Sequence, residues 1–500
     1  MFYFIPSLYE EGESWQESDP VWFRHKSTVC FDGFTNYLRM LERSDEEAVI
    51  FVPEYAPNLR HYLYRQGIRK TKVVSLFDKI QNITSGLEIS NFNYRELDWP
   101  SGVEFVYNPF AILAYRHGER FARILHGIGG NIVRIEFYRE NIMSKVVVFD
   151  ERGFISRIDL YEKNGTLTEK RYFNDVGMLQ LVEKKDGLVI RSNNGRKESY
   201  TNTSSLVRRS LKEYFNKYLT ANDVVLVAAD ENKMKSIVRS FTNKKVILSC
   251  SSSRPFDYDW IHKNSNTING IILDSDQYWD SMSGIFGRNV RVVPPINMSL
   301  SPSRSIQKTW QRIIFRIDGL SDDDIYFSIR TILEFISQHD NIYLTIFSHS
   351  DFDNRELLTS TITDAGEGLF TINFSDECDI EKKPKRYCID FYAIKAEEEL
   401  VRLVGDSRIL IDLAANPNVF IQMIGLSLGV PQINTHYSGY VDNNTNGMII
   451  ASLGSELRNA LVFYLLDIDH WNVSLADSIG KIRRFYDENI INTLEGIADD

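Results

Sequence analysis

Short apolar runs alternate with helical patterns over the first hundred residues of this chain. The runs at residues 2–7, 48–52 and 72–76 are rich in aromatic and β-branched side chains, and residues 57–67 repeat apolar positions at helical spacing between the last two. Strands that are apolar on both faces and separated by helices are typical of a parallel sheet with both faces covered. The pattern predicts a first α/β unit.

The rhythm changes to strict alternation from about residue 109. Residues 132–137 and 154–160 alternate apolar and polar positions with a period of two, and glycine-containing turn signals such as residues 163–165 recur at short intervals. This spacing is typical of hairpins in an antiparallel meander. We therefore expect residues 109–200 to form a β-sheet inserted into the first α/β unit. One face should be solvated, because many strand positions are Arg, Lys or Glu.

A second α/β unit follows a predicted linker. The strand–helix pattern returns after residue 200, until Pro294-Pro295 and a serine-rich stretch at residues 299–305 interrupt it. A second alternating set begins at residue 313 and ends in helical patterns. The predicted fold class is α/β, with two Rossmann-type domains facing a cleft. The expected domains are residues 1–108 with 201–298 (first Rossmann domain), 109–200 (inserted sheet), 299–475 (second Rossmann domain) and 476–500 (C-terminal helix).

Composition excludes several classes of function. The chain carries 57 Lys and Arg against 68 Asp and Glu, a net charge of −11, and so lacks the basic surface of a nucleic-acid-binding protein. Its four cysteines form no CxxC pair and its nine histidines no HExxH motif; we expect reduced thiols, no metal site and no cofactor. No basic signal region opens the chain, and no apolar stretch approaches the roughly 18 residues of a membrane span. We expect a cytoplasmic protein that reaches a membrane only through partners.

Three short motifs suggest chemistry that their context does not support. Residues 425–429 (GLSLG) match the GxSxG nucleophile elbow, but a helix precedes the serine and a strand follows it, the reverse of the required order. Asp274-Ser275-Asp276 matches the metal-binding DxD pattern, yet it stands alone at the end of a predicted strand. Residues 126–130 (HGIGG) connect two meander strands rather than opening a helix. We interpret these motifs as a chance match, a loop cap and a hairpin turn.

Residues 411–450 carry three turn signals in a fixed order behind a predicted strand and helix: Gly429-Val430-Pro431, residues 435–439, and Asn446-Gly447. This order resembles the nucleotide-sugar-binding segment of retaining GT-B glycosyltransferases, enzymes built from two Rossmann domains. The resemblance implies a GT-B-like fold. The alternative is a generic Rossmann helix–strand unit.

The same resemblance implies a damaged donor site. The family's paired glutamates, which contact the donor sugar and its ribose, would fall at Asn416 and Ile424, and isoleucine cannot accept a hydrogen bond. A cationic clamp normally neutralises the donor diphosphate. Arg316 stands in that region, but residues 322–324 (DDD) occupy the place expected for the lysine, and carboxylates repel a diphosphate. We predict a degenerate glycosyltransferase that is not an enzyme. The alternative is an active retaining GT-B glycosyltransferase acting on an adhesin.

Features along the whole chain point to one family: residues 1–7 (MFYFIPS), 31–38, 51–67 and 75–78 (SLFD), the inserted sheet, and the damaged donor site. Together they resemble the glycosyltransferase-like accessory Sec system proteins, the first of the Asp accessory secretion proteins of Gram-positive bacteria. The resemblance implies a non-catalytic protein that binds a serine-rich-repeat adhesin bearing N-acetylglucosamine (GlcNAc). It also implies partners: an acetyltransferase-like and a small carbohydrate-binding-like companion accessory Sec protein, and an accessory SecA-type motor.

Four residues are candidate sugar ligands: Asn416, Asn418, Tyr437 and Ser438. We expect them on loops at the carboxyl edge of the second sheet, where ligands of open α/β sheets bind. The asparagine amides would donate hydrogen bonds to the sugar and the tyrosine ring would stack on it; the alternative is that these residues only cap the loops. The inserted sheet is the candidate docking surface, because sheets offer edges for pairing. The alternative is that it only shields the first Rossmann domain.

Overall fold

The structure is a computed structural model, and it describes most of the chain. The described residues are 1–7, 33–44, 47–65, 67–84, 93–127, 129–193, 195–241, 245–252, 254–294, 301–348, 355–375, 383–394, 397–485 and 487–499. They fall into two compact units, which are divided in sequence between Ile271 and Ile272. The predicted linker at residues 299–305 lies partly outside the described residues.

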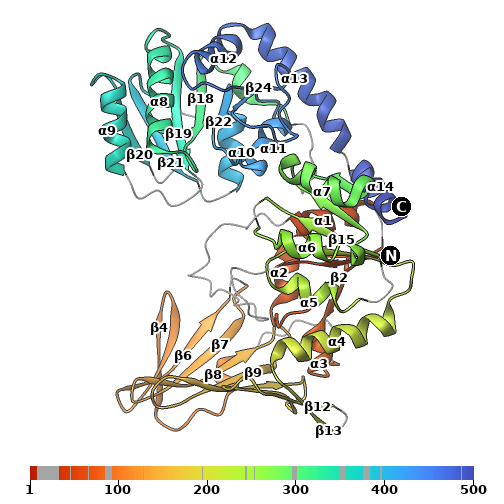
Figure 1. Cartoon of the computed structure of the whole chain (residues 1–500). Coiled ribbons are helices and arrows are strands. Elements are labelled where there is room, and N and C mark those ends of the chain that lie inside the picture. The colour runs from red at the N-terminus through yellow and green to blue at the C-terminus, as the bar shows by residue number, and fades with distance from the viewer. Residues whose placement is uncertain are drawn as a thin grey trace. The chain divides into compact units, whose positions relative to one another are not determined.

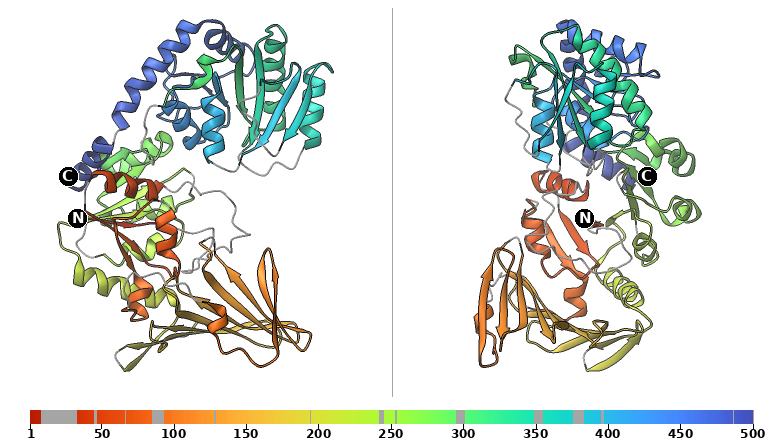
Figure 2. Two further views of the ribbon diagram at one scale, coloured as in Figure 1. Left: turned by 180° about the vertical axis from the view of Figure 1, so that it is seen from behind. Right: turned by 90° about the vertical axis from the view of Figure 1, so that its left-hand side faces the viewer.

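The first sheet has seven strands in the order β17-β16-β15-β14-β1-β2-β3. Its central pairs are parallel, and strands such as β14, with the sequence VVLVA, are buried along their whole length. Helices cover both faces (Figures 1 and 2), as the apolar runs predict. The strands are β1 (Phe2–Ile5), β2 (Ala48–Val52), β3 (Lys72–Ser75), β14 (Val224–Ala228), β15 (Lys245–Cys250), β16 (Gly270–Leu273) and β17 (Val290–Val292). The helices are α1 (Gly33–Ser44), α2 (Leu59–Arg65), α3 (Leu76–Ile80), α4 (Thr203–Tyr218), α5 (Lys233–Val238), α6 (Tyr258–Lys263) and α7 (Trp279–Phe286).

The inserted sheet is an antiparallel meander of ten strands, in which each strand pairs with its neighbour in the chain. Its first strand runs from Val103 to Asn108, so the sheet begins before the predicted boundary at residue 109. On one face the half-buried Arg134 lies with its Nε 3.1 Å from the buried Glu136 carboxylate. The strands are β4 (Val103–Asn108), β5 (Ala111–Arg116), β6 (Glu119–His126), β7 (Ile132–Arg139), β8 (Ile142–Phe149), β9 (Ile155–Tyr161), β10 (Leu167–Phe173), β11 (Leu179–Lys184), β12 (Val189–Asn193) and β13 (Arg196–Tyr200).

The second parallel sheet has the strand order β20-β21-β19-β18-β22-β23-β24. The chain ends in two helices, α13 (Ile468–Ile482) and α14 (Asp487–Asp499), whereas the sequence predicts a single C-terminal helix at residues 476–500. The strands are β18 (Gln311–Arg316), β19 (Ile342–Ser348), β20 (Thr371–Ser375), β21 (Cys388–Ala393), β22 (Ile409–Asp412), β23 (Gln432–Asn434) and β24 (Gly447–Ile449). The helices are α8 (Asp322–Ser337), α9 (Arg355–Ala365), α10 (Glu397–Gly405), α11 (Val419–Ser427), α12 (Ser455–Leu466), α13 (Ile468–Ile482) and α14 (Asp487–Asp499).

The described residues contain neither a membrane-spanning helix nor a cluster of metal ligands. They contain no helix that is both long and apolar enough to cross a membrane. Within the same residues, no three His, Cys, Asp or Glu side chains gather as metal ligands would. Two of the four cysteines, Cys250 and Cys388, lie in the described part of the chain, and neither is in a disulfide bond.

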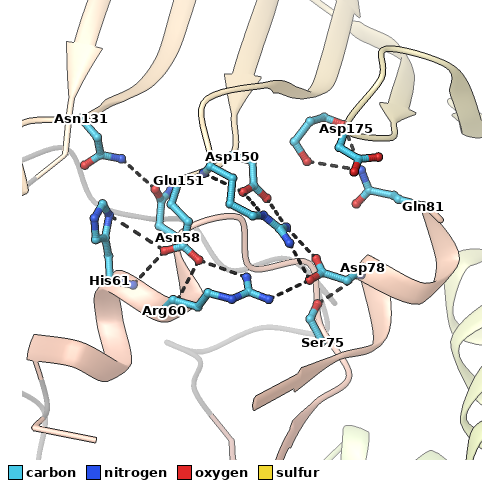
Figure 3. A network of polar contacts seen from close by, with 12 residues as sticks. Asn58, Arg60, His61, Ser75, Asp78, Gln81, Asn131, Asp150, Glu151 and Asp175 are labelled. Atoms are coloured by element: carbon cyan, nitrogen blue, oxygen red, sulfur yellow. Dashed lines mark hydrogen bonds and ion pairs between the residues drawn. The ribbon is translucent and has the colours of Figure 1, made fainter. Parts of the chain in front are cut away.

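A buried ionic network fixes the inserted sheet to the first Rossmann domain (Figure 3). The turn between β8 and β9 brings Glu151 to the start of α2, where its fully buried carboxylate accepts the backbone N–H groups of Arg60 (3.0 Å) and His61 (2.8 Å). Arg152, in the same turn, donates two hydrogen bonds, of 3.0 and 2.9 Å, to Asp78 on α3. Arg60 also donates to Asp78, at 3.0 Å. The buried Arg152 and the half-buried Arg60 therefore share one carboxylate, and Arg152 donates in addition to Asp150 of its own turn at 2.6 Å.

Buried aromatic rings pack beside this network. The Arg157 guanidinium lies 4.8 Å from the centre of the Tyr55 ring and 5.7 Å from that of Tyr172, within the range of a cation–π interaction. Tyr172 also packs edge-on against Tyr55, with the ring centres 5.2 Å apart. Gln81 after α3 donates hydrogen bonds to the carbonyls of Ser156 and Phe173, at 3.2 and 2.6 Å. The attachment therefore combines ion pairs with buried apolar contact.

Asp78→Asn should destabilise the chain by about 2 kcal/mol at pH 7, because it removes the carboxylate that both guanidinium groups share and leaves Arg152 with Asp150 and Arg60 with Glu151 alone. The hydrogen bonds from Arg152 and Arg60 lower the pKa of Asp78 against the opposing effect of burial. Its ionised form therefore stabilises the fold above the unfolded pKa of about 3.9, and this contribution is lost as the pH falls through the lowered folded value. The difference in the free energy of unfolding between wild type and variant, measured by urea denaturation, should accordingly decrease towards pH 3.

Asp175→Asn is the matched control, because Asp175 accepts hydrogen bonds from the backbone N–H and the hydroxyl of the exposed Thr84 in the same region, at 3.1 and 3.2 Å. We expect it to change the free energy of unfolding by less than about 1 kcal/mol. If the two variants change the free energy of unfolding equally, the ionic network is not what fixes the inserted sheet to the first Rossmann domain.

Candidate functional site at the carboxyl edge of the second sheet

The site forms where two neighbouring parallel strands end. Strand β22 has the buried sequence ILID and pairs with β18, so that Asp412 and Arg316 stand side by side as the last residues of their strands. A short loop leads from Asp412 to α11, which begins after its N-cap residue, Asn418. Carboxyl ends of parallel strands and the starts of the following helices share one edge of the sheet. The sequence order strand–loop–helix therefore places the loop at the ligand-binding edge.

Arg316 is held between two carboxylates. Its Nη1 donates to Asp412 Oδ1 at 2.9 Å, and its Nε lies 3.2 Å from Asp318 Oδ2. Asp318 in turn accepts a hydrogen bond from the Ser348 hydroxyl at 2.6 Å. The Arg316 residue is 8 % exposed. The predicted diphosphate clamp is thus a buried cation whose charge is already balanced.

The Asp412 carboxylate also serves the start of α11. Its Oδ2 accepts the backbone N–H of Asn418 at 2.9 Å, and its Oδ1 lies 3.4 Å from the N–H of Ala414. Its side chain is fully buried. Burial raises the pKa of Asp412, while Arg316 and the two N–H groups act in the opposite direction. One side chain therefore engages both the guanidinium and the positive end of the helix.

Two of the four predicted sugar ligands make structural hydrogen bonds. The Asn418 side chain caps α11 by accepting the N–H of Ile421 at 3.1 Å, the alternative stated for these residues. The Ser438 hydroxyl is buried and donates to the side-chain oxygen of Gln422. These two polar groups stabilise the loops on either side of α11.

The other two predicted ligands are exposed. Asn416 lies in the loop before α11, where its side-chain oxygen accepts a hydrogen bond from Gln277 at 3.2 Å. Tyr437 is 56 % exposed, and burial of its hydroxyl, with the nearby Asp276 and Asp442 carboxylates, raises its pKa. Both side chains can therefore contact a ligand from solvent.

The positions expected to carry the family's paired glutamates do not lie on one surface. Asn416 is exposed, whereas Ile424 is 4 % exposed and packs in an apolar cluster with Ile314, Phe347 and Leu410. Residues 322–324 form the exposed first turn of α8, whose N-cap is Ser321. Carboxylates in a first turn stabilise a helix by opposing its dipole. These aspartates thus have a local structural role.

The short motifs have the structural context that the sequence suggests. Residues 425–427 of the GLSLG motif lie in the last turns of α11, so its serine has no strand before it. Asp274 and Ser275 follow β16 directly. The described part of residues 126–130 ends β6 and turns at Gly130, where φ is +80°. Sequence reasoning missed Asp412 and Asp318; Asp412 is the acidic last residue of an otherwise apolar strand, but that pattern alone does not distinguish it from other polar strand ends.

Comparisons with known proteins cover the whole chain. The family model of the accessory Sec system protein that is first in the Asp series matches residues 1–499. A member of that family from Staphylococcus aureus (strain NCTC 8325 / PS 47) is 27 % identical over 513 residues, covering 100 % of this chain and 99 % of the relative.

Two solved structures share the fold. The Glycosylation Associate Protein (Gap123) complex from Streptococcus agalactiae contains a chain that is 27 % identical, with a TM-score of 0.78, covering 99 % of this chain and 100 % of that chain. The pneumococcal O-GlcNAc transferase GtfA, solved with UDP and GlcNAc, is 12 % identical, with a TM-score of 0.67, covering 100 % of this chain and 99 % of that one. The second likeness bears on fold alone, and it confirms the predicted GT-B-like architecture.

Proposed function

The chain belongs to the accessory Sec system family that is first in the Asp series, and on that premise we propose that it is a non-catalytic, glycosyltransferase-like component of this secretion system. In this proposal it binds a serine-rich-repeat adhesin bearing GlcNAc and assembles with companion accessory Sec proteins for modification and export of the adhesin. It works in the cytoplasm and meets the membrane only through its partners, among them an accessory SecA-type motor.

The contact between Arg316 and Asp412 carries the non-catalytic part of the proposal. A donor diphosphate needs a cation whose charge is not already neutralised by the protein. Stabilisation of the transition state by such a cation is a large part of catalysis. Arg316 instead has Asp412 and Asp318 within 3.2 Å. A further anion at this place would meet two carboxylates against one guanidinium, and like charges repel. An active retaining glycosyltransferase would need a different cation here.

Assembly with companions is supported by the solved relative, which is described as a complex, and by the two edges of the inserted sheet. The edge strand β13 has the sequence RKESY, and charges on an edge oppose pairing with other chains. The opposite edge, β4, has the sequence VEFVYN, with Val106 49 % exposed and Tyr107 56 % exposed. An apolar edge strand is suited to receive a strand from a partner. The proposal therefore places a companion on β4.

Val106→Lys should weaken capture of the companion accessory Sec proteins by about tenfold, a loss of about 1.4 kcal/mol, because a charge on an edge strand disfavours strand addition. Val106 is opposite Leu113 of β5 and exposed, so the fold should tolerate the change. The measurement is the affinity of the purified chain for each companion.

Ser199→Lys on the exposed edge β13 is the matched control, and it should leave capture unchanged. If the β4 variant binds the companions with wild-type affinity, β4 is not the docking surface. A loss of capture by the β13 variant alone would move the docking surface to the other edge.

For the adhesin, we propose Asn416 and Tyr437 as the sugar contacts, because these two of the predicted ligands reach solvent. The double substitution Asn416→Ala with Tyr437→Ala should lower the affinity for a serine-rich-repeat peptide bearing GlcNAc by about tenfold. Binding of the unglycosylated peptide should not change. Glu398→Ala, on the exposed surface of α10, is the control. If the double variant keeps its affinity for the glycosylated peptide, the sugar is bound elsewhere.

A further inference from the structure

The two residues proposed as sugar contacts are both held by one short segment of the chain. Asn416 and Tyr437 come from different loops at the carboxyl edge of the second sheet, and both are exposed. Asp276 and Gln277 are consecutive residues in the segment that follows β16. Asp276 accepts a hydrogen bond from Tyr437, and Gln277 donates one to Asn416. All four residues belong to the second compact unit, so one segment contacts both loops within it.

The contact with Tyr437 involves a charged acceptor. The Tyr437 hydroxyl donates to the Asp276 carboxylate; burial, and then the nearby negative charges, raise the pKa of Tyr437. The same hydrogen bond opposes the rise in the pKa of Asp276, of which burial is the main cause. A hydrogen bond to an ionised acceptor is stronger than one between neutral groups. It therefore restrains a tyrosine side chain that is 56 % exposed.

The backbone of the Tyr437 loop packs against the same segment. The hydroxyl of the fully buried Tyr440 donates to the backbone carbonyl of Asp274. Gly439 lies so close to Asp276 that a Cβ atom on it would be 2.6 Å from Asp276 Oδ2, and its φ of +83° is one that residues with side chains rarely adopt. The segment after β16 therefore fixes the backbone of this loop as well as the Tyr437 side chain.

The contact with the second loop sets the orientation of an amide. Gln277 Nε2 donates to Asn416 Oδ1 at 3.2 Å. Because the amide oxygen of Asn416 is engaged in this way, the group that its side chain offers to a ligand is the NH2 group. That is the group expected to donate hydrogen bonds to a sugar.

We propose that Asp276 and Gln277 are positioning residues of the sugar site, which hold Tyr437 and Asn416 in the arrangement that a GlcNAc residue contacts. This inference rests on the proposed function of Asn416 and Tyr437 and adds the residues through which they act. Ligand contacts that are ordered before binding lose less conformational entropy when the ligand binds. Removal of a positioning residue should therefore lower the affinity although no sugar contact is deleted.

Hydrogen exchange of the free chain tests the positioning without a ligand. In the double variant Asp276→Ala with Gln277→Ala, the backbone amides of residues 414–418 and 435–441 should exchange about fivefold faster than in wild type, because both loops open more easily. The amides of β18 and β22 should exchange at the wild-type rate. Asp280→Ala, in the first turn of α7, is the matched control and should leave both loops unchanged. Wild-type exchange of both loops in the double variant would overturn the proposal.

The affinity for a serine-rich-repeat peptide bearing GlcNAc tests whether binding uses this positioning. Asp276→Ala should lower the affinity by about fivefold. Asp276→Asn keeps an acceptor oxygen for the Tyr437 hydroxyl and should retain most of it. In a Tyr437→Phe background, Asp276→Ala should cause no further loss, because its effect passes through the phenol. An Asp276→Ala variant with wild-type affinity, or one that loses as much in the Tyr437→Phe background, would overturn the proposal.

The sugar contacts and their positioning fail in different ways. If Asn416→Ala with Tyr437→Ala keeps the wild-type affinity, the sugar is bound elsewhere and the positioning role is wrong with it. If that double variant loses affinity while the Asp276→Ala and Gln277→Ala variants keep it, the sugar contacts stand and only the positioning role is wrong. Gln277 is exposed, so Gln277→Ala should fold and keeps the test decisive if Asp276→Ala does not.

Discussion

A buried guanidinium must have a counter-charge within hydrogen-bonding reach, and this constraint shapes both units of the chain. In the second unit it pairs Arg316 with Asp412 at the carboxyl edge of the sheet, where relatives of this fold bind their ligands. Breaking such a pair from one side leaves a buried charge uncompensated. The interaction that stabilises this edge is therefore also the one on which the proposed absence of donor binding rests.

The same constraint attaches the inserted sheet. Arg60 and Arg152 share Asp78, while Glu151 of the sheet caps the helix that carries Arg60. Arg152 also donates to Asp150 in its own turn, so Asp78 adds a carboxylate from the first Rossmann domain to a pair that already exists within the sheet. The ten strands are thus fixed at one place by buried ion pairs, and the strand β4 remains exposed at the far edge of the order. A protein that acts through contacts needs such a rigidly held surface.

Much of the fold could be predicted because local patterns suffice for it. Buried runs such as residues 48–52 specify parallel strands, and glycine turns with period-two alternation specify the meander. The start of the sheet at Val103 was missed because β4 alternates less clearly than its neighbours. The candidate site was harder to predict from the sequence. Asn418 and Ser438 resemble ligand-binding residues in the sequence, but their side chains form hydrogen bonds within the protein. Asp412 resembles any polar residue at the end of a strand. Those roles depend on which strands become neighbours, which the local sequence does not encode.

The central claim is that the chain keeps the architecture of a glycosyltransferase without its chemistry. It is tested most directly by incubating the purified protein with UDP-GlcNAc and the serine-rich-repeat acceptor, and measuring UDP release together with the heat of nucleotide-sugar binding. The account predicts release no faster than spontaneous hydrolysis and no measurable heat, because Arg316, the guanidinium at the carboxyl edge of the second sheet, is already paired with Asp412. Micromolar binding of UDP-GlcNAc, or transfer of the sugar to the acceptor, would contradict it.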